Sequence, residues 1–305
     1  MSDDQGKHLG LLNYQPAVQK HFIEQGTAFE KHFCTQSQCC PSRVSCRTGK
    51  HSHSTNVTNV LPPFGGYPKF GPVKFYPGEY STDLVSEKSV EFLDEAAESS
   101  RRFLLFGMPI GPHGQVWFPN ATNPGIESEP PVVAEPHNTC IRTQSLGRPD
   151  GRLGLGSKLP QTLPRQNQTV VDYWDEFYRL RLRSLASVDD MINSIMSGLE
   201  SHNLLDDTYV IYTSDNGFHI GRHCLQPGKT NCYEEDVNVP FFIRGPGVAR
   251  DATVPHPTSH IDLTPTILDP TNTPLTRWIP HQCTIFTRKE VCSSATPHRK
   301  SRIET

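Results

Sequence analysis

Apolar residues recur along the chain at two spacings, which predict helices that alternate with short buried strands. The strongest helix is expected over 172–201, where one apolar stripe has helical spacing: Val188, Met191, Ile192, Ile195 and Leu199. Further helices are expected over 14–30 and 82–98. Short continuous apolar runs over 103–108, 209–213 and 240–244 predict strands that are buried on both faces. This alternation favours an α/β fold with a largely parallel sheet and helices on its faces.

Three stretches lack this pattern. Residues 51–80 and 111–168 are rich in proline, glycine and polar residues, and are expected to be loops. After Asp269 no period remains, so 270–305 is predicted to be an unpatterned tail. The whole chain has 27 prolines and 22 glycines, too many for a helical bundle. The sequence therefore predicts one loop-rich domain over 1–269.

The charge and hydropathy of the chain exclude two classes of partner. Lysine and arginine number 29 against 32 acidic residues, a net charge of −3, so no basic surface for nucleic acid is expected. No apolar run approaches the roughly 18 residues of a membrane span, so no membrane contact is expected. The polar residues Met1 to Asp4 do not resemble a secretory signal peptide.

The cysteines and the glycosylation sequons bear on where the protein is located in or outside the cell. The nine cysteines do not have the paired spacing of a structural zinc site. Sequons begin at Asn56, Asn120 and Asn167, which favours a secretory history. This disagrees with the missing signal peptide.

Two acidic segments are candidates for a cation site. Asp215 and Asn216 directly follow the strand predicted over 209–213, and Gly217 permits a tight turn there. Asp3 and Asp4 supply two further carboxylates. Four oxygen ligands from two segments suit Ca²⁺ or Mg²⁺. The alternative is that Asp215-Asn216-Gly217 is an ordinary turn.

A cysteine-containing run is the second candidate. In Cys39-Cys40-Pro41-Ser42-Arg43, Pro41 is placed to open a helix, so Cys39 is expected beside a helix N-terminus, which stabilises anions. Arg43 lies one turn further on and could bind a tetrahedral anion. The alternative is a disulfide or a buried thiol. His113, His219 and Lys229 follow predicted strands, and each one alone is weak evidence.

Together these motifs resemble the sulfatase family. The Cys-x-Pro-Ser-Arg run with Thr48-Gly49, the Asp3-Asp4 pair, the Pro-His at His113, and the block from Ser214 to Gly217 followed by Lys229 are similar to fungal arylsulfatases and glucosamine-6-sulfatases. The resemblance extends from about Asp3 to Asp269. It implies an alkaline-phosphatase-like fold with a mixed, largely parallel sheet flanked by helices.

The resemblance also implies a chemistry. Cys39, not Cys40, would be oxidised to formylglycine by the formylglycine-generating enzyme, and its hydrate would attack the sulfur of a small-molecule sulfate ester. One Ca²⁺ would be held by five residues: Asp3, Asp4, Asp215, Asn216 and the modified Cys39. Arg43 would orient the formylglycine. Lys229 and His113, with His219 nearby, would neutralise sulfate oxygens or protonate the leaving oxygen. Family relatives are secreted or vacuolar.

The sequence departs from the family at four places. No apolar strand precedes Asp3, and no Thr-Gly-Lys-x-x-x-His block lies between Phe70 and Tyr80. Arg47 replaces an apolar helix residue, and the C-terminal subdomain is missing or incomplete after Asp269. We therefore expect a truncated and internally deleted sulfatase that hydrolyses sulfate esters poorly or not at all.

Two other readings stay open at this point. The chain could be a pseudo-enzyme or binding module that has kept the fold and lost the chemistry. It could also be a metal-dependent phosphohydrolase of the same fold, although those use serine or threonine as nucleophile. The mass of the peptide spanning Cys34 to Arg43 separates these readings, because only a matured sulfatase carries formylglycine at Cys39.

Overall fold

A computed structural model describes residues 1–61, 64–65, 78–99, 101–117, 127–146 and 166–268. The predicted tail 270–305 and the sequon at Asn120 lie outside these residues. So does most of the stretch between Phe70 and Tyr80.

The centre of the molecule is a four-stranded sheet. Its strands are β1 (Thr27–Phe33), β4 (Val210–Thr213), β5 (Phe241–Arg244) and β6 (Ala252–Ser259), in the order β4-β5-β1-β6. β5 pairs antiparallel with both β4 and β1, whereas β1 and β6 are parallel. Three of the four strands therefore run in one direction with β5 opposed, which confirms the expected mixed sheet.

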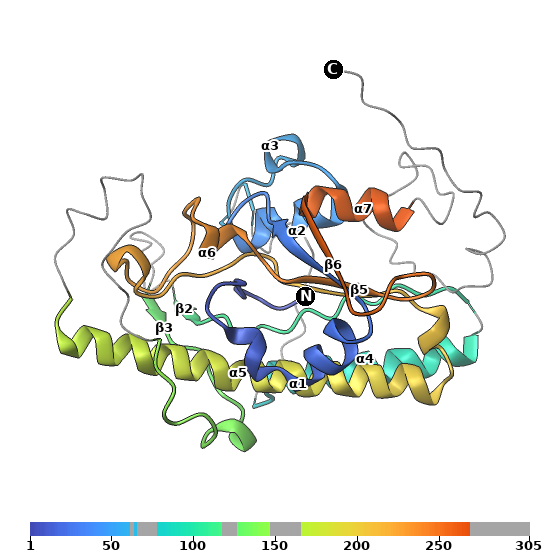
Figure 1. The fold of residues 1–305 in the computed structure, drawn as a ribbon, viewed down its shortest axis with the longest axis horizontal. Coiled ribbons are helices and arrows are strands. Elements are labelled where there is room, and N and C mark those ends of the chain that lie inside the picture. The colour runs from blue at the N-terminus through green and yellow to red at the C-terminus, as the bar shows by residue number, and fades with distance from the viewer. Residues whose placement is uncertain (62–63, 66–77, 100, 118–126, 147–165, 269–305) are drawn as a thin grey trace.

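Helices cover both faces of this sheet (Figure 1). The long helix α5 (Gln168–Ser201) and α4 (Ser81–Ser99) pack together on one face. The helices α2 (Cys39–Thr48) and α7 (His260–Leu268) pack together on the other. The side chain of Asn167 caps α5 by accepting a hydrogen bond from the Val170 N–H at 3.0 Å. The result is three layers, with a core on each side of the sheet.

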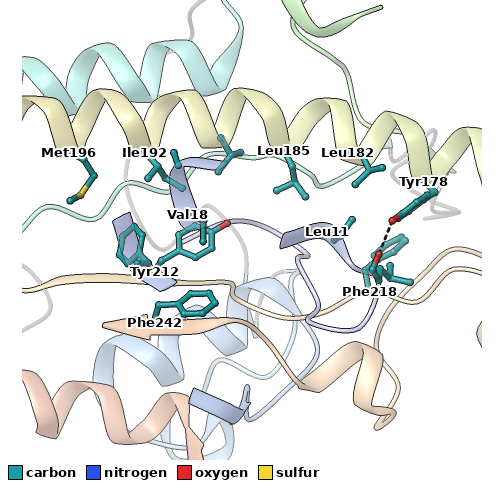
Figure 2. Packing of buried hydrophobic residues seen from close by; sticks show 14 of the residues in the cluster. Leu11, Val18, Tyr178, Leu182, Leu185, Ile192, Met196, Tyr212, Phe218 and Phe242 are labelled. Atoms are coloured by element: carbon teal, nitrogen blue, oxygen red, sulfur yellow. Dashed lines mark hydrogen bonds between the residues drawn. The ribbon is translucent and has the colours of Figure 1, made fainter. Parts of the chain in front are cut away.

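The larger core lies between α5 and the sheet (Figure 2). Leu182, Leu185 and Val188 of α5 are completely buried there, which places the predicted apolar stripe in the core. The ring of Tyr212 stacks on Phe242 from β5 at 6.3 Å between centroids. The smaller core, on the α2 and α7 side, is formed around Cys46, Phe241 and Leu263.

Shorter elements connect these layers. They are α1 (Pro16–Val18), a π-helical turn (Gln19–Ile23), α3 (Ser52–Thr55), the paired strands β2 (Gln115–Trp117) and β3 (Glu127–Glu129), α6 (Glu234–Val237) and 3₁₀ helices at Leu11–Tyr14, Glu135–His137, Leu205–Asp207 and Arg222–Cys224. None of the helices in the described part of the chain is long and apolar enough to cross a membrane.

Two predicted elements were wrong. The helix expected over 14–30 ends at Ile23, and Thr27–Phe33 forms β1. Gly26 lies between them, where a Cβ would be 2.5 Å from the Ile243 carbonyl oxygen. The run 103–108, predicted to be a strand, forms no regular secondary structure. The predicted helices over 82–98 and 172–201 and the strands over 209–213 and 240–244 are confirmed to within a few residues.

Candidate active site

The sheet brings distant segments to one edge. Because β4 and β1 are both antiparallel to β5, they run parallel to each other and end at the same edge of the sheet. Asp215 and Asn216 follow β4, and α2 follows β1. The N-terminal residues join them through a parallel bridge between Ser2 and Ser214. Ligands of α/β sheets bind at this kind of edge.

Cys39 lies among carboxylates at this edge. Its Sγ is 3.5 Å from Oδ1 of Asp3 and 3.9 Å from Oδ1 of Asp4. With His113, these three residues offer four ligand atoms that all lie within 4.8 Å of one another. Residues that are far apart in the sequence therefore meet as the sequence analysis expects.

Two cations neutralise this cluster. The Lys229 ammonium donates to Oδ1 of Asp4 at 2.5 Å and to Sγ of Cys39 at 2.6 Å. Arg43 bridges two carboxylates, with Nη2 2.6 Å from Oδ2 of Asp3 and 2.9 Å from Oδ2 of Asp215. Buried carboxylates are stable only when cations pair with them, as Lys229 and Arg43 do here.

Asp215 and Asn216 are completely buried. Oδ1 of Asp215 accepts hydrogen bonds from the backbone N–H groups of Asp4 and Asn216. The Asn216 amide donates to Oδ1 of Asp4 at 2.6 Å, and its own Oδ1 is buried without a hydrogen-bond partner. An unpartnered buried oxygen beside three carboxylates is the donor set that a hard cation such as Ca²⁺ prefers. The residues present therefore fit the expected metal.

Gly217 is required for this arrangement. A Cβ at this position would lie 2.0 Å from the Glu235 carbonyl oxygen, so the chain can pass there only without a side chain. Its N–H donates to the Asp236 carbonyl at 2.8 Å. The Asp-Asn-Gly motif is thus more than a turn signal, because its glycine fixes the path that carries Asp215 and Asn216 to the cluster.

The cysteine motif begins α2. Cys39 is the first residue of the helix, and Pro41 falls in the first turn, where a missing N–H costs no helical bond. Gly49 ends the helix with a φ of 64°, which glycine adopts without strain. The motif therefore directs Cys39 into the cluster from a helix N-terminus, whose dipole favours negative charge.

The surroundings shift the acidity of the site. Burial, and then the charges of Asp4 and Asp3, raise the pKa of the Cys39 thiol well above its usual range. Burial together with the neighbouring Asp215 raises the pKa of Asp3 to about 6. Burial opposes the ionisation of Asp4, but the charges of Lys229 and His113 lower its pKa to about 2. An unmodified Cys39 is therefore a protonated thiol at neutral pH, and a poor nucleophile.

The two candidate histidines have different environments. Nδ1 of His113 donates to the Gly114 carbonyl at 2.5 Å, so Nε2 faces Asp4 at 3.6 Å. His219 is buried and donates from Nδ1 to Oδ1 of Asp236 at 2.7 Å. Among the described contacts, His113 belongs to the carboxylate cluster and His219 lies beside it, next to the backbone of Gly228.

Three residues that contact the site were missed. Arg181 of α5 is fully buried and donates to the backbone carbonyls of Asp4 and Pro112. The hydroxyl of Ser42 donates to the Asp215 carbonyl, and Nδ1 of His260 lies 3.0 Å from the same hydroxyl. Of these three residues, only Arg181 stands out in the sequence, because it is a charged residue within the apolar stripe of α5.

Seven of the nine cysteines lie in the described residues, and each of the seven is a free thiol. Cys39 and Cys40 are among them. Among the described cysteines, Cys39 therefore forms no disulfide.

The chain is similar to known sulfatases. The Sulfatase family profile matches residues 64–273. The chain is 40% identical over 282 residues to the protein named "Sulfatase ppz1" from Metarhizium majus (strain ARSEF 297), covering 90% of this chain and 62% of that protein. It is 31% identical to the protein named "Arylsulfatase" from Chlamydomonas reinhardtii, covering 84% of this chain and 52% of the relative.

A solved structure has the same fold. The structure of yidJ from Bacteroides fragilis superposes with a TM-score of 0.69 and 18% identity, covering 94% of this chain and 75% of that one. The fold is therefore alkaline-phosphatase-like, as the resemblance implied. The chain spans 62% and 52% of the lengths of the two curated relatives above. With the family profile matched over most of its length and the cysteine motif at the carboxylate cluster, the chain belongs to the sulfatase family.

Proposed function

We propose that this chain binds small sulfate monoesters at the cluster around Cys39 and hydrolyses them to an alcohol and sulfate. The observation that carries this proposal is the contact of Cys39 with Asp3, Asp4 and Lys229 at the N-terminus of α2. A sulfate group needs positive charge on its oxygens and a nucleophile in line with its sulfur. The Lys229 ammonium supplies positive charge 2.6 Å from Sγ of Cys39, the position that modification would convert to the nucleophile.

One Ca²⁺ is the metal that the proposal requires. Asp3, Asp4, Asp215 and the unpartnered oxygen of Asn216 would hold it. The bound ion would polarise a sulfate oxygen and lower the pKa of a nearby hydroxyl. Lys229 pairs with Asp4, and Arg43 pairs with Asp3 and Asp215, so both cations lie at the proposed site.

Cys39 needs modification to act as the nucleophile. The raised pKa of its thiol disfavours attack by sulfur. Oxidised to formylglycine, position 39 would supply a hydrated aldehyde with two hydroxyls, one to attack the sulfur and one to release sulfate. We therefore propose the formylglycine-generating enzyme as a partner during maturation, and a secretory route for the chain.

Three further residues would bind sulfate oxygens or transfer a proton. Lys229 would bind a sulfate oxygen, because it already lies between Sγ of Cys39 and Asp4. His113 donates from Nδ1 to a carbonyl, which leaves Nε2 on the side of the site to hold or release a proton at the leaving oxygen. Asp236 would fix the orientation of His219 for contact with the sulfate.

The test is a chromogenic aryl sulfate assay on protein co-expressed with the maturation enzyme. We expect formylglycine at Cys39 by mass spectrometry and turnover that is below that of a full-length relative, because a lysine and a histidine of the family are missing from the expected block. Cys39→Ala should abolish turnover, whereas the matched variant Cys40→Ala should keep it. Formylglycine without turnover would favour the pseudo-enzyme reading, and an unmodified thiol would refute the proposal for this chain.

A further inference from the structure

Three buried polar side chains next to the acidic cluster form a closed ring of hydrogen bonds. Gln5 and Gln15 have no exposed surface, and Tyr212 is 3% exposed. The Gln5 amide donates to Oε1 of Gln15 at 2.5 Å, and the Gln15 amide donates to the Tyr212 hydroxyl at 3.0 Å. The Tyr212 hydroxyl donates to Oε1 of Gln5 at 2.5 Å, which closes the ring. Because buried polar groups are costly without partners, these three side chains hold one another in place.

Tyr212 connects this ring to the sheet. Its aromatic ring stacks on Phe242 of β5 and lies tilted against Phe22, with centroids 6.3 Å and 5.7 Å apart. Burial raises the pKa of Tyr212 to about 12, so its hydroxyl keeps its proton at neutral pH and can donate to Gln5. The aromatic contacts fix where this hydroxyl lies, and the hydroxyl in turn fixes the Gln5 amide.

The ring reaches the acidic cluster through the peptide group between Asp4 and Gln5. The N–H of this group donates to Oγ of Ser214 at 2.8 Å, and its carbonyl accepts from the buried guanidinium of Arg181. Ser214 directly precedes Asp215, so the same contacts join the two segments that supply the carboxylates. The peptide group is therefore held from both sides, and its orientation fixes the backbone of Asp4.

Asp4 needs this support because its backbone conformation is unfavourable. Its φ of 66° costs free energy for any residue other than glycine. In this conformation Oδ1 of Asp4 reaches both the Lys229 ammonium and the Asn216 amide. A return of φ to the ordinary range would move the carboxylate away from both groups. Such a return requires Gln5 to move, and the buried ring opposes that movement.

We propose that Tyr212 is a positioning residue for the acidic cluster: through Gln5 it holds Asp4 in the conformation that places its carboxylate beside Cys39 and Lys229. Groups that orient a metal ligand in this way usually affect metal affinity without contacting the metal. The inference deepens the proposed function and rests on it, because it takes the cluster as the site that binds Ca²⁺ and the sulfate ester.

The test compares Tyr212→Phe with Tyr178→Phe in the full chain. Both substitutions remove one buried hydroxyl from the core between α5 and the sheet (Figure 2), but the Tyr178 hydroxyl donates to the Leu9 carbonyl at 2.8 Å instead of to Gln5. Each variant should lower the Tm by about 2–4 °C. Only Tyr212→Phe should lower the affinity for Ca²⁺, by at least about tenfold in isothermal titration calorimetry. A hydroxyl with a merely structural role would lower the Tm and leave the affinity unchanged.

A second measurement does not require the metal. Hydrogen exchange of the Asp4 and Gln5 amides in the metal-free chain should be at least about tenfold faster in Tyr212→Phe, and unchanged in Tyr178→Phe. Gln15→Met breaks the ring on its other side and leaves Tyr212 in place. It should change both the exchange rate and the Ca²⁺ affinity in the same direction as Tyr212→Phe.

The two measurements separate this inference from the proposed function. A parent chain that binds no Ca²⁺, with faster exchange in the Tyr212 variant, would refute the metal assignment and support the positioning role. Unchanged exchange at Asp4 and Gln5 would overturn the positioning role. Faster exchange with an unchanged Ca²⁺ affinity would also overturn it, because the ring would then hold the backbone without placing the carboxylate. Equal effects in the Tyr212 and Tyr178 variants would mean that loss of any buried hydroxyl loosens the cluster, which contradicts the proposal as well.

Discussion

Asp4 is the residue on which most of the site converges. Its Oδ1 accepts from Asn216 and from Lys229, and its backbone carbonyl accepts from Arg181. Its φ of 66° lies in the left-handed region that residues other than glycine seldom adopt. Strain of this kind persists where the surroundings hold it in place, and often marks a functional position. Three segments that are distant in the sequence provide that support here.

The metal assignment can be tested at Asp215. Asp215→Asn keeps the shape of the side chain but removes a negative charge from the proposed donor set. We expect the affinity for Ca²⁺ to fall at least about tenfold by isothermal titration calorimetry. Asp83→Asn removes an exposed carboxylate at the start of α4 and serves as the control, with affinity unchanged. Equal affinities in both variants would contradict the assignment.

A buried histidine beneath the site predicts a pH dependence of stability. Burial lowers the pKa of His260 to about 4, whereas in the unfolded chain it is about 6.5. Between these values the unfolded chain binds more protons, so the free energy of unfolding falls as the pH drops from about 6.5 to about 4. Two and a half pKa units correspond to a loss on the order of 3 kcal/mol.

Urea unfolding at pH 7 and pH 4.5 measures this loss. His260→Gln should lose less stability on acidification than the parent chain, because glutamine does not titrate. His8→Gln replaces a more exposed histidine and should behave as the parent does. An equal loss in the parent chain and the His260 variant would show that other groups cause the acid sensitivity.

Among the elements, helices with a long apolar stripe were the most predictable. The spacing of Val188 to Leu199 alone was enough to place α5. β1 was not predictable in the same way, because Phe29 and His32 lie in a sequence that also suits a helix, and only pairing with β5 and β6 selects the strand. A local hydrophobic pattern predicts an element when the residues of that element carry the periodicity themselves. The pattern fails where pairing with distant strands selects the secondary structure.

Arg181 links α5 to the site and offers a test at this scale. Arg181→Met leaves the carbonyls of Asp4 and Pro112 without their donor in a buried place. We expect the free energy of unfolding to fall by about 2–4 kcal/mol, measured by urea titration. Arg179→Met removes a partly buried arginine of the same helix whose hydrogen bonds go to the more exposed Glu176 and to the Gln144 carbonyl, and should change stability by less than about 1 kcal/mol. Similar effects in the two variants would contradict the role given to Arg181.

At the scale of the molecule, the motifs located the site and the fold assembled it. The sequence named Asp3, Asp4, Cys39, Arg43, His113, Asp215, Asn216 and Lys229, and the structure brings these eight side chains together. Ser42 and His260 escaped notice because their contacts depend on how α2 and α7 pack. Contacts made by packing have no local signature in a single sequence.

One hydrophobic cluster connects α4, α5 and the sheet, so the described residues should unfold together. Leu185→Ala empties a fully buried position and should cost about 2–5 kcal/mol. Tyr173→Ala, at a half-exposed position of the same helix, is the control. Tryptophan fluorescence and far-ultraviolet circular dichroism should give the same midpoint in each variant. Two separate transitions would show that the predicted domain 1–269 is not a single cooperative unit.

The long helix has one more consequence. α5 has 34 residues and is about 50 Å long, and it holds the Asp4 carbonyl through Arg181, near its middle. A helix of this length moves as a stiff rod, so a displacement along its axis would shift Arg181 and Asp4 by the same amount. Substitutions in α4, which packs along α5, should therefore shift Asp4 and change the geometry of the acidic cluster without altering any residue of the cluster itself.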